Sequence, residues 1–415
     1  MDLEARLNNL ENTHEWHAMV EALEQGIASA QDDGVKAQLH LRLGRLLRDR
    51  FLQGVKALKH FQDAFKLNNT LTEALEEARS VYWELGKLNM VQKLLELQLK
   101  NTSDNVAGSE LCVLLGDVLT DQGDYDRATE AYAKALQLAA GQPSRASQML
   151  EDVQVAPDQW QDHIGSLLRG AHGEDSAEGK AMAFLRASRV ATRFAPEEVE
   201  GILGQAYAAD PSGTVSGALF EGYLVTQDRT DSIVEAQRKV LDADVDAATK
   251  AGIAYRFGVR WATRHQNLDL AKKLFEEALK ADPTRDDAFN CLREIYGAEG
   301  NWARNLELAE QVASSTDGVS HAAALAAAGS IAWRQQGDLI RARGYFEQLA
   351  GVSPMHPALK AFEAQIGEAL TPGDEPVVAD EPAAEVEEVA DEPQVEAAAD
   401  EADVEIEAEE AGEEL

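Results

Sequence analysis

The sequence predicts an all-α protein: a solenoid of helical hairpins followed by a disordered acidic tail. Through the first 370 residues, stretches of 10–16 residues with apolar side chains at helical spacing alternate with short breaks that contain Gly, Asp, Asn or Pro. The sequence lacks period-two apolar runs bounded by Asn-Gly or Asp-Gly turns, which argues against strands. Because a single hairpin exposes an apolar face, we expect neighbouring hairpins to stack on one continuous core.

The clearest hairpin has its first apolar stripe at residues 111–118. The break Gly123-Asp124-Tyr125 follows, and the second stripe contains Ala128, Tyr132 and Ala135. Two closely crossing helices need this combination, because alanine lets the backbones approach and the aromatic ring fills the space beside them. The segment is therefore interpreted as an antiparallel helical hairpin.

This hairpin resembles the tetratricopeptide repeat (TPR) family, whose pattern has Leu-Gly in the first helix, a Gly-Asp-Tyr-like turn, and Ala, Phe or Tyr, and Ala in the second. Leu115-Gly116 supplies the first element, and the turn and second helix described above supply the rest. Further matches are Leu268, Ala271, Phe275, Ala278 and Asp282-Pro283; Leu43-Gly44 with Ala57, Phe61 and Ala64; Ala342, Phe346, Ala350 and Pro354; and Asp210-Pro211. The resemblance implies a right-handed α-solenoid of about ten TPR-like hairpins, closed by a polar-faced helix at residues 357–370.

A longer period indicates an internal duplication. Trp16, Trp160 and Trp302 each open a helix after a polar break, 144 and 142 residues apart. The Ala, Tyr, Ala positions of the clearest hairpin recur 143 residues later as Ala, Phe, Ala. We predict a first solenoid half at residues 1–159 and a second half with the closing helix at residues 160–370, with chance recurrence of repeat features as the alternative. A long loop is expected at residues 170–179.

Residues 371–415 are predicted to form a disordered acidic tail. This segment contains 19 Asp or Glu, no Lys or Arg and no aromatic residue. Such a composition offers too little apolar surface to offset the entropy of ordering the chain. Val404-Glu405-Ile406-Glu407 is a candidate motif that orders on a partner, and a purely solubilising tail is the alternative.

The formal charge of −36 excludes several classes of partner. Phosphate binding needs a basic surface, so direct binding to nucleic acid is not expected, and anionic membranes are disfavoured for the same reason. No apolar run approaches the length of a membrane span, so no membrane insertion is expected. Two cysteines and an N-terminus without signal-peptide features lead us to expect a cytoplasmic protein.

Candidate catalytic chemistry is sparse. His14 and His17 have a spacing that can bind a metal, but no third ligand is suggested, so a surface helix start is the preferred interpretation. Cys112 and Cys291 lie on apolar stripes of first helices, as buried free cysteines do. The sequence has no phosphate-binding loop, Gly-x-Ser-x-Gly or catalytic triad order. We therefore predict a protein that is not an enzyme and has no cofactor or metal.

The scarce basic residues form two stripes. One contains Arg42, Arg45 and Arg48, and the other contains Arg256, Arg260 and Arg264. Either stripe is explained by a solvated face with salt bridges or by a binding surface. The family resemblance implies a concave groove lined by Arg45, Arg48, Arg79, Arg256, Arg260 and Asn290. Arginines there would bind carboxylates of a peptide, although the family's full clamp for chaperone tails is not present.

These features predict a non-enzymatic interaction scaffold or adaptor that binds partner proteins or peptides through the concave face. The alternative is an acidic-tail chaperone or nucleic-acid mimic that binds a basic protein. The tail is also expected to bind weakly to the C-terminal part of the groove, because its carboxylates could pair with the arginines there.

Overall fold

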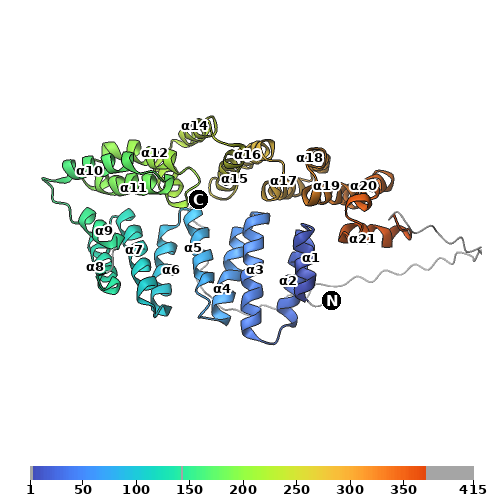
Figure 1. Cartoon of the computed structure of the whole chain (residues 1–415), viewed down its shortest axis with the longest axis horizontal. Coiled ribbons are helices and arrows are strands. Elements are labelled where there is room, and N and C mark those ends of the chain that lie inside the picture. Colours follow the sequence, from blue (N-terminus) through green and yellow to red (C-terminus); the bar gives the residue numbers. More distant parts are fainter. Residues whose placement is uncertain (1–2, 142–143, 371–415) are drawn as a thin grey trace, which may run out of the picture. The chain divides into compact units, whose positions relative to one another are not determined.

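The computed structural model describes residues 3–141 and 144–370, and every regular element in these residues is a helix (Figure 1). The all-α solenoid prediction is confirmed over this part of the chain. The predicted tail, residues 371–415, lies outside the described residues. Among the described helices, none combines the length and the apolar character that a bilayer crossing requires.

Helices that follow one another in the chain form hairpins, as α3 does with α4, α7 with α8 and α15 with α16. The first nine helices are α1 (Leu3–Asn12), α2 (Trp16–Ser29), α3 (Asp33–Phe51), α4 (Gly54–Leu67), α5 (Glu73–Glu84), α6 (Leu88–Asn101), α7 (Asn105–Asp121), α8 (Tyr125–Ala139) and α9 (Arg145–Val153). We call these nine helices the first arm.

The remaining helices make up the second arm. They are α10 (Trp160–Gly173), α11 (Ala177–Phe194), α12 (Val199–Ala209), α13 (Thr214–Thr226), α14 (Thr230–Leu241), α15 (Ala247–Thr263), α16 (Leu268–Ala281), α17 (Asp286–Ala298), α18 (Trp302–Ser315), α19 (Gly318–Ser330), α20 (Leu339–Val352) and α21 (Pro357–Ile366). A 3₁₀ turn at Pro196–Glu198 precedes α12, and a π-helical turn at Ile331–Gln335 extends α19.

Aspartates fix the start of several first helices. The Oδ1 atom of Asp104 accepts a hydrogen bond from the backbone N–H of Ala107 at 2.8 Å, and Asp32 and Asp246 make the same bond at the start of α3 and α15. A capping carboxylate satisfies a backbone donor that has no partner within the helix. The turn between α7 and α8 is made by Gly123, whose φ of +80° is easily adopted only without a Cβ atom.

A glycine in the first helix brings the aromatic ring of the second helix onto its backbone. A Cβ atom built on Gly116 would lie 2.4 Å from Cε1 of Tyr132, far inside van der Waals contact. The same arrangement joins Gly44 to Phe61, Gly258 to Phe275 and Gly329 to Phe346. The close crossing that the sequence predicted from its small and aromatic residues is therefore present in four hairpins.

The three tryptophans behind the predicted duplication open α2, α10 and α18, which are eight helices apart in each case. Helices α2 and α18 pack as second helices on α1 and α17, whereas α10 packs on the following helix α11 instead of on α9, so the expected place of Trp160 on a second helix is wrong. The duplication of residues 16–159 in residues 160–301 stays a prediction. The expected long loop at residues 170–179 is wrong, because α10 continues to Gly173 and α11 begins at Ala177.

The closing helix α21 covers the end of the core. Leu359 and Phe362 are fully buried, and the Phe362 ring stacks on Phe346 of α20 with centroids 4.4 Å apart. The helix ends at Gly367, whose φ is +69°. It is therefore shorter than residues 357–370 but takes the predicted place.

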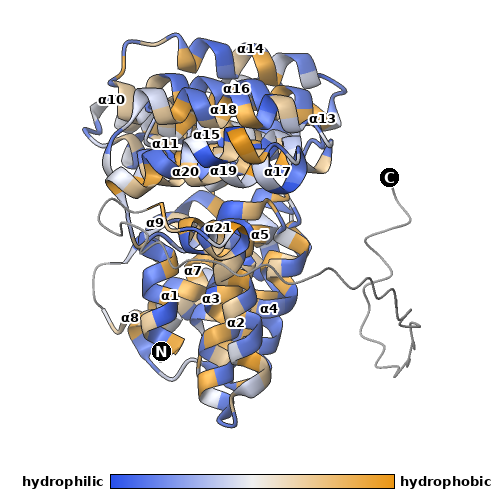
Figure 2. Ribbon diagram, turned by 90° about the vertical axis from the view of Figure 1, so that its right-hand side faces the viewer, coloured by the Kyte–Doolittle hydropathy of each residue, from blue (hydrophilic) through white to orange (hydrophobic). Residues whose placement is uncertain are grey.

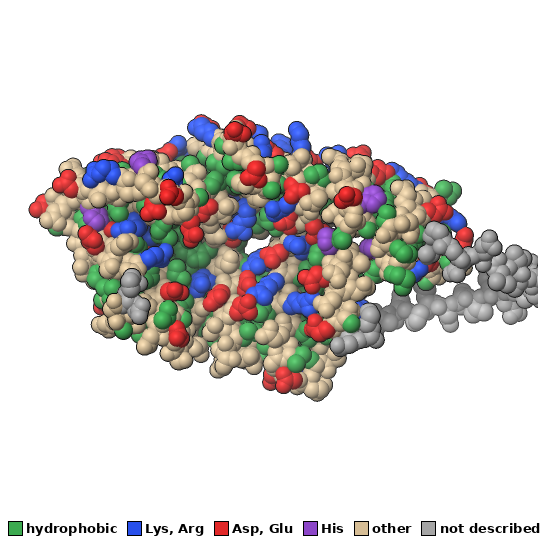
Figure 3. Space-filling model, in the orientation of Figure 1, with side chains coloured by type: hydrophobic (Ala, Val, Ile, Leu, Met, Phe, Trp, Pro, Cys, Tyr) green, Lys and Arg blue, Asp and Glu red, His purple; other side chains and the backbone are tan. Residues whose placement is uncertain are grey.

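The chain reverses direction between α9 and α10, so that the two arms lie against each other (Figures 1 and 2). Helix α3 packs on α17, and α5 packs on α13. In the space-filling view, acidic and basic side chains gather along the line where the arms meet (Figure 3). The inner surface of each arm thus faces the other arm.

Candidate functional site

The arginine stripe of α15 lies at the contact between the arms. The Nη2 atom of Arg256 is 2.5 Å from Oε1 of Glu84, the last residue of α5, and Nε of Arg260 is 3.6 Å from Oε2 of the same carboxylate. A Cβ atom on Gly217 of α13 would lie 2.3 Å from Cζ of Arg260, so only glycine leaves room for this guanidinium. The stripe is therefore covered by α13 and by the end of α5.

Arg260 belongs to a buried polar network around Glu221. The side chains of Arg260 and Glu221 are 1% and 0% exposed, and Nη1 of the arginine lies 3.4 Å from Oε1 of the carboxylate. Tyr207 donates its hydroxyl to Oε1 at 3.1 Å, and Nε2 of His265 lies 2.9 Å from Oε2. Burial alone would raise the pKa of Glu221, but the His265 hydrogen bond and the Arg260 charge hold it below its usual value. Arg260 thus supports the fold and is not open to a ligand here.

Asn290 is likewise enclosed by the arms. It is 1% exposed, and its Nδ2 atom donates a hydrogen bond to the carbonyl oxygen of Arg50 at 2.6 Å. Beside it, Trp16 donates Nε1–H to Asp286 at 3.3 Å, and the Arg50 guanidinium lies over the Trp16 ring. A residue expected to line an open groove therefore joins α17 to the end of α3.

The stripe on α3 is a salt-bridged face within the first arm. Arg45 lies 2.7 Å from Glu77, and Arg48 pairs with Glu77 and Asp49. Arg79 donates a hydrogen bond to Gln98. Arg45 also lines an open cavity of about 510 Å³ along α1, α2 and α3, so this part of the predicted groove remains accessible from solvent.

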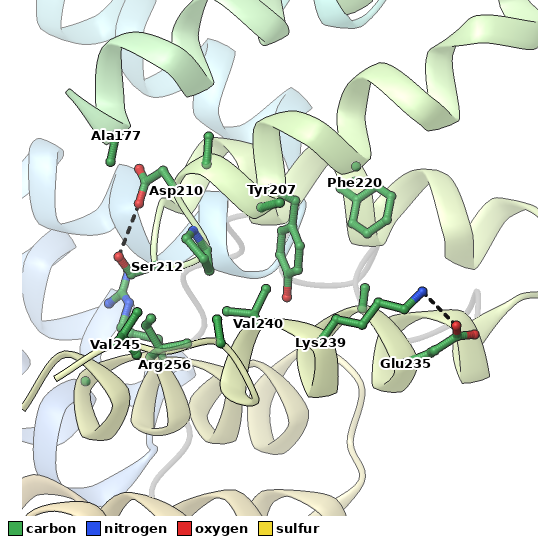
Figure 4. A pocket seen from close by; sticks show the side chains of 18 of the residues that line it. Ala177, Tyr207, Asp210, Ser212, Phe220, Glu235, Lys239, Val240, Val245 and Arg256 are labelled. Atoms are coloured by element: carbon green, nitrogen blue, oxygen red, sulfur yellow. Dashed lines mark hydrogen bonds and ion pairs between the residues drawn. The ribbon is translucent and has the colours of Figure 1, made fainter. Parts of the chain in front are cut away.

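A large pocket lies between α12, α13, α14 and α15 and has a volume of about 1220 Å³ (Figure 4). Its walls are largely apolar and include Tyr207, Phe220, Ala236, Val240 and Ile253. The pocket exists because α14 packs loosely between its neighbours, so that their side chains do not close the space. Its size suits several side chains of a bound peptide.

Charged side chains form the rim of this pocket. Arg229 pairs with Glu200 at 2.6 Å, and Lys239 pairs with Glu235 at 2.8 Å (Figure 4). These pairs neutralise the side of the pocket near α14.

The opposite side of the pocket keeps positive charge. Arg256 and Arg285 line it, while their carboxylate partners, Glu84 and Asp287, are not lining residues. The side of the pocket near α15 therefore suits a carboxylate.

Sequence reasoning found Arg256 but missed Glu84, Arg285 and the pocket itself. Arg285 lies two residues after the Asp-Pro that ends a recognised repeat, where a turn was the only expectation. Glu84 lies just before a Leu-Gly break, a place that carries no functional signal by itself. The approach of the arms gives Glu84 its role, whereas Arg285 and the pocket depend on packing within the second arm.

The candidate metal and thiol groups have structural roles. His14 lies 2.9 Å from Asp286, and His17, whose side chain is exposed, lies 2.8 Å from Glu294, so both histidines contact the second arm. In the part of the chain that the structure describes, no group of three or more His, Cys, Asp or Glu side chains could hold a metal ion. Cys291 is fully buried, which raises the pKa of its thiol.

The comparison with protein families gives one match, which describes a tetratricopeptide repeat at residues 109–142. These residues include α7 and α8, the hairpin with the Gly116 and Tyr132 contact. Residues 109–142 are thus a tetratricopeptide repeat, and the hairpins with the same glycine and ring contact resemble it. No curated protein sequence matches the chain significantly.

Several solved structures are similar to the chain. The TPR2AB domain of yeast Sti1, solved as a complex with pHSP90, is 13% identical, with 74% of this chain and 99% of that chain covered and a TM-score of 0.26. The P58(IPK) TPR domain is 15% identical, with 80% and 97% covered and a TM-score of 0.24. Yeast Tom70 is 13% identical, with 88% of each chain covered and a TM-score of 0.25.

Proposed function

We propose that the chain is a non-enzymatic, cytoplasmic protein–protein interaction scaffold that binds a peptide segment carrying both apolar and acidic side chains. The pocket between α12 and α15 carries this proposal, because it is open, has apolar walls and presents Arg256 and Arg285 on one side. A partner segment would place apolar side chains against Val240 and Ile253 and a carboxylate beside Arg256. Repeat solenoids commonly offer extended surfaces of this kind.

Of the six residues expected to line a groove, Arg256 lines this pocket. Arg45 and Arg48 lie on the accessible face of the first arm and are proposed as a second, weaker contact for a longer partner. Arg260 and Asn290 are proposed to hold the arms and to make no ligand contact, because both are 1% exposed.

A synthetic peptide with the sequence of residues 400–415 is a suitable probe, since it contains Val404, Ile406 and Leu415 among many acidic residues. We expect the labelled peptide to bind in fluorescence polarisation and to bind less well at high salt, which screens the charge contacts. Ala236→Glu should abolish binding, because it adds a negative charge to an apolar wall. Ala303→Glu on α18, an exposed site outside the pocket, is the matched control.

The probe also distinguishes the alternative function. An acidic-tail chaperone would bind a basic probe such as polylysine through residues 371–415, and it would lose that binding when the tail is deleted. Ala236→Glu would then leave binding unchanged. Tail-dependent binding of polylysine together with no peptide binding by the pocket would overturn the scaffold proposal.

A further inference from the structure

We propose that Arg256 couples the α12–α15 pocket to the contact between the two arms. A ligand carboxylate in the pocket takes Arg256 away from Glu84 and thereby loosens the packing of α5 on α13. This inference rests on the proposed function, because it needs an acidic ligand in that pocket.

The Arg256 guanidinium lies between the α12–α15 pocket and the contact of the two arms. Arg256 lines the pocket, and its side chain is 37% exposed, whereas that of Glu84 is 15% exposed. Besides the 2.5 Å contact with Glu84, Nη2 of Arg256 lies 3.0 Å from Oγ1 of Thr214, the first residue of α13. A ligand carboxylate that draws this guanidinium into the pocket therefore competes with a contact that joins α15, α13 and α5.

Glu84 depends on this contact more than a surface carboxylate would. It is the C-terminal residue of α5, where the negative end of the helix dipole disfavours a carboxylate. Its compensation comes from Arg256, from the Thr214 hydroxyl at 3.3 Å and from the more distant Arg260. When Arg256 turns to a ligand, Glu84 keeps a partly buried charge with weaker partners.

The loosening is confined to one end of the arm contact. The bonds from Asn290 to Arg50 and from Trp16 to Asp286 join α17 to α2 and α3, and no pocket residue takes part in them. The arms would therefore open at α5 and α13 while they stay joined at α3 and α17. Because solvent reaches Arg256, its ion pair with Glu84 is partly screened, so the coupling is expected to be modest.

Glu84→Gln in the full chain tests the coupling, because it removes the competing charge and keeps the shape. Coupling between two sites is reciprocal, so a weaker arm contact should raise the affinity for the peptide of residues 400–415 by the same factor by which the bound peptide weakens that contact. We expect a factor of about three to ten. Glu96→Gln is the matched control, since Glu96 pairs with Arg127 at 2.8 Å within the first arm.

A distance measurement provides the second readout. Spin labels on cysteines introduced at Lys93 of α6 and Thr226 of α13, both exposed, report the separation of the arms beside the contact of α5 with α13. Cys112 and Cys291 are fully buried and should not label. We expect the label distances to broaden in Glu84→Gln without ligand, and in the wild type when the peptide is added.

The outcomes separate the two proposals. If the peptide binds the pocket but Glu84→Gln changes neither the affinity nor the label distances, the coupling is wrong and the scaffold function stands. If the peptide binds neither the wild type nor Glu84→Gln, the proposed function is wrong, and the coupling falls with it. Tighter binding and broader distances in Glu84→Gln, with Glu96→Gln unchanged, support both.

Discussion

The Nε2 atom of His356 lies 3.3 Å from the carbonyl oxygen of Thr13, a residue 343 positions earlier in the chain. The Nδ1 atom of the same ring accepts the backbone N–H of Ala358 and so caps α21. Nε2 therefore carries the proton and donates to Thr13. A neutral histidine that is 1% exposed thus joins the closing helix to the first arm.

We expect His356 to make stability depend on pH. Burial lowers the pKa of His356 to about 4. Between pH 4 and about 6.5 the unfolded chain binds a proton that the folded chain does not, so stability should fall as the pH is lowered through this range. The loss should reach up to about 3 kcal/mol relative to neutral pH.

Urea unfolding of the wild type and His356→Gln from pH 4 to 7 measures this effect. The difference between the two isolates His356, because Glu15, whose pKa is raised by burial, titrates in both. Parallel pH profiles for the two proteins would show that folding does not change the pKa of His356.

Asn290→Ala should destabilise the contact between the arms. The change leaves the buried carbonyl of Arg50 without its 2.6 Å hydrogen bond, which costs about 1–3 kcal/mol. In Asn101→Ala, the lost bond to Leu97 is exposed, so a change of less than about 0.5 kcal/mol is expected. Thermal melts compare the two variants, and equal losses would contradict the buried role of Asn290.

Gly116→Ala should be destabilising although alanine favours helices. The new methyl group would meet the Tyr132 ring at 2.4 Å, and such overpacking costs about 1–3 kcal/mol. The Cβ atom of Gly201→Ala on α12 would have no atom within 4 Å, so this variant should raise the free energy of unfolding by about 0.5–1 kcal/mol. Urea melts decide between them, and a stabilising Gly116→Ala would mean that the ring does not lie on the glycine.

Glu221→Leu should cost about 3–5 kcal/mol, because Arg260 would lose its buried carboxylate partner and keep only the more distant Glu84. Adding Arg260→Met should restore at least half of the loss, since the poorly paired charge is then removed. Glu235→Gln, which affects only the exposed pair with Lys239, should leave the melting temperature unchanged. Additive losses for Glu221→Leu and Arg260→Met would argue against their pairing.

Most of the fold could be predicted from the sequence, because each hairpin is determined by contacts between residues that are close together in the chain. Helical spacing, small residues and rings specify each hairpin, and Gly116 with Tyr132 shows how closely the predicted and observed contacts agree. The long loop at residues 170–179 was mispredicted because Gly170 and Gly173, which favour a break locally, are held in α10. The pocket could not be predicted, since it depends on how loosely α14 packs against both neighbours.

The sequence by itself determined the helical hairpins, the closing helix and the buried positions of Cys112 and Cys291. It also determined that the arginines of α15 form a stripe, because residues four apart share a helix face. What covers that stripe was decided only by the tertiary structure, which places Glu84 against Arg256 across 172 residues. The physical reason is that the approach of the arms depends on small rotations summed over many stacked hairpins, and no local pattern of residues encodes that sum.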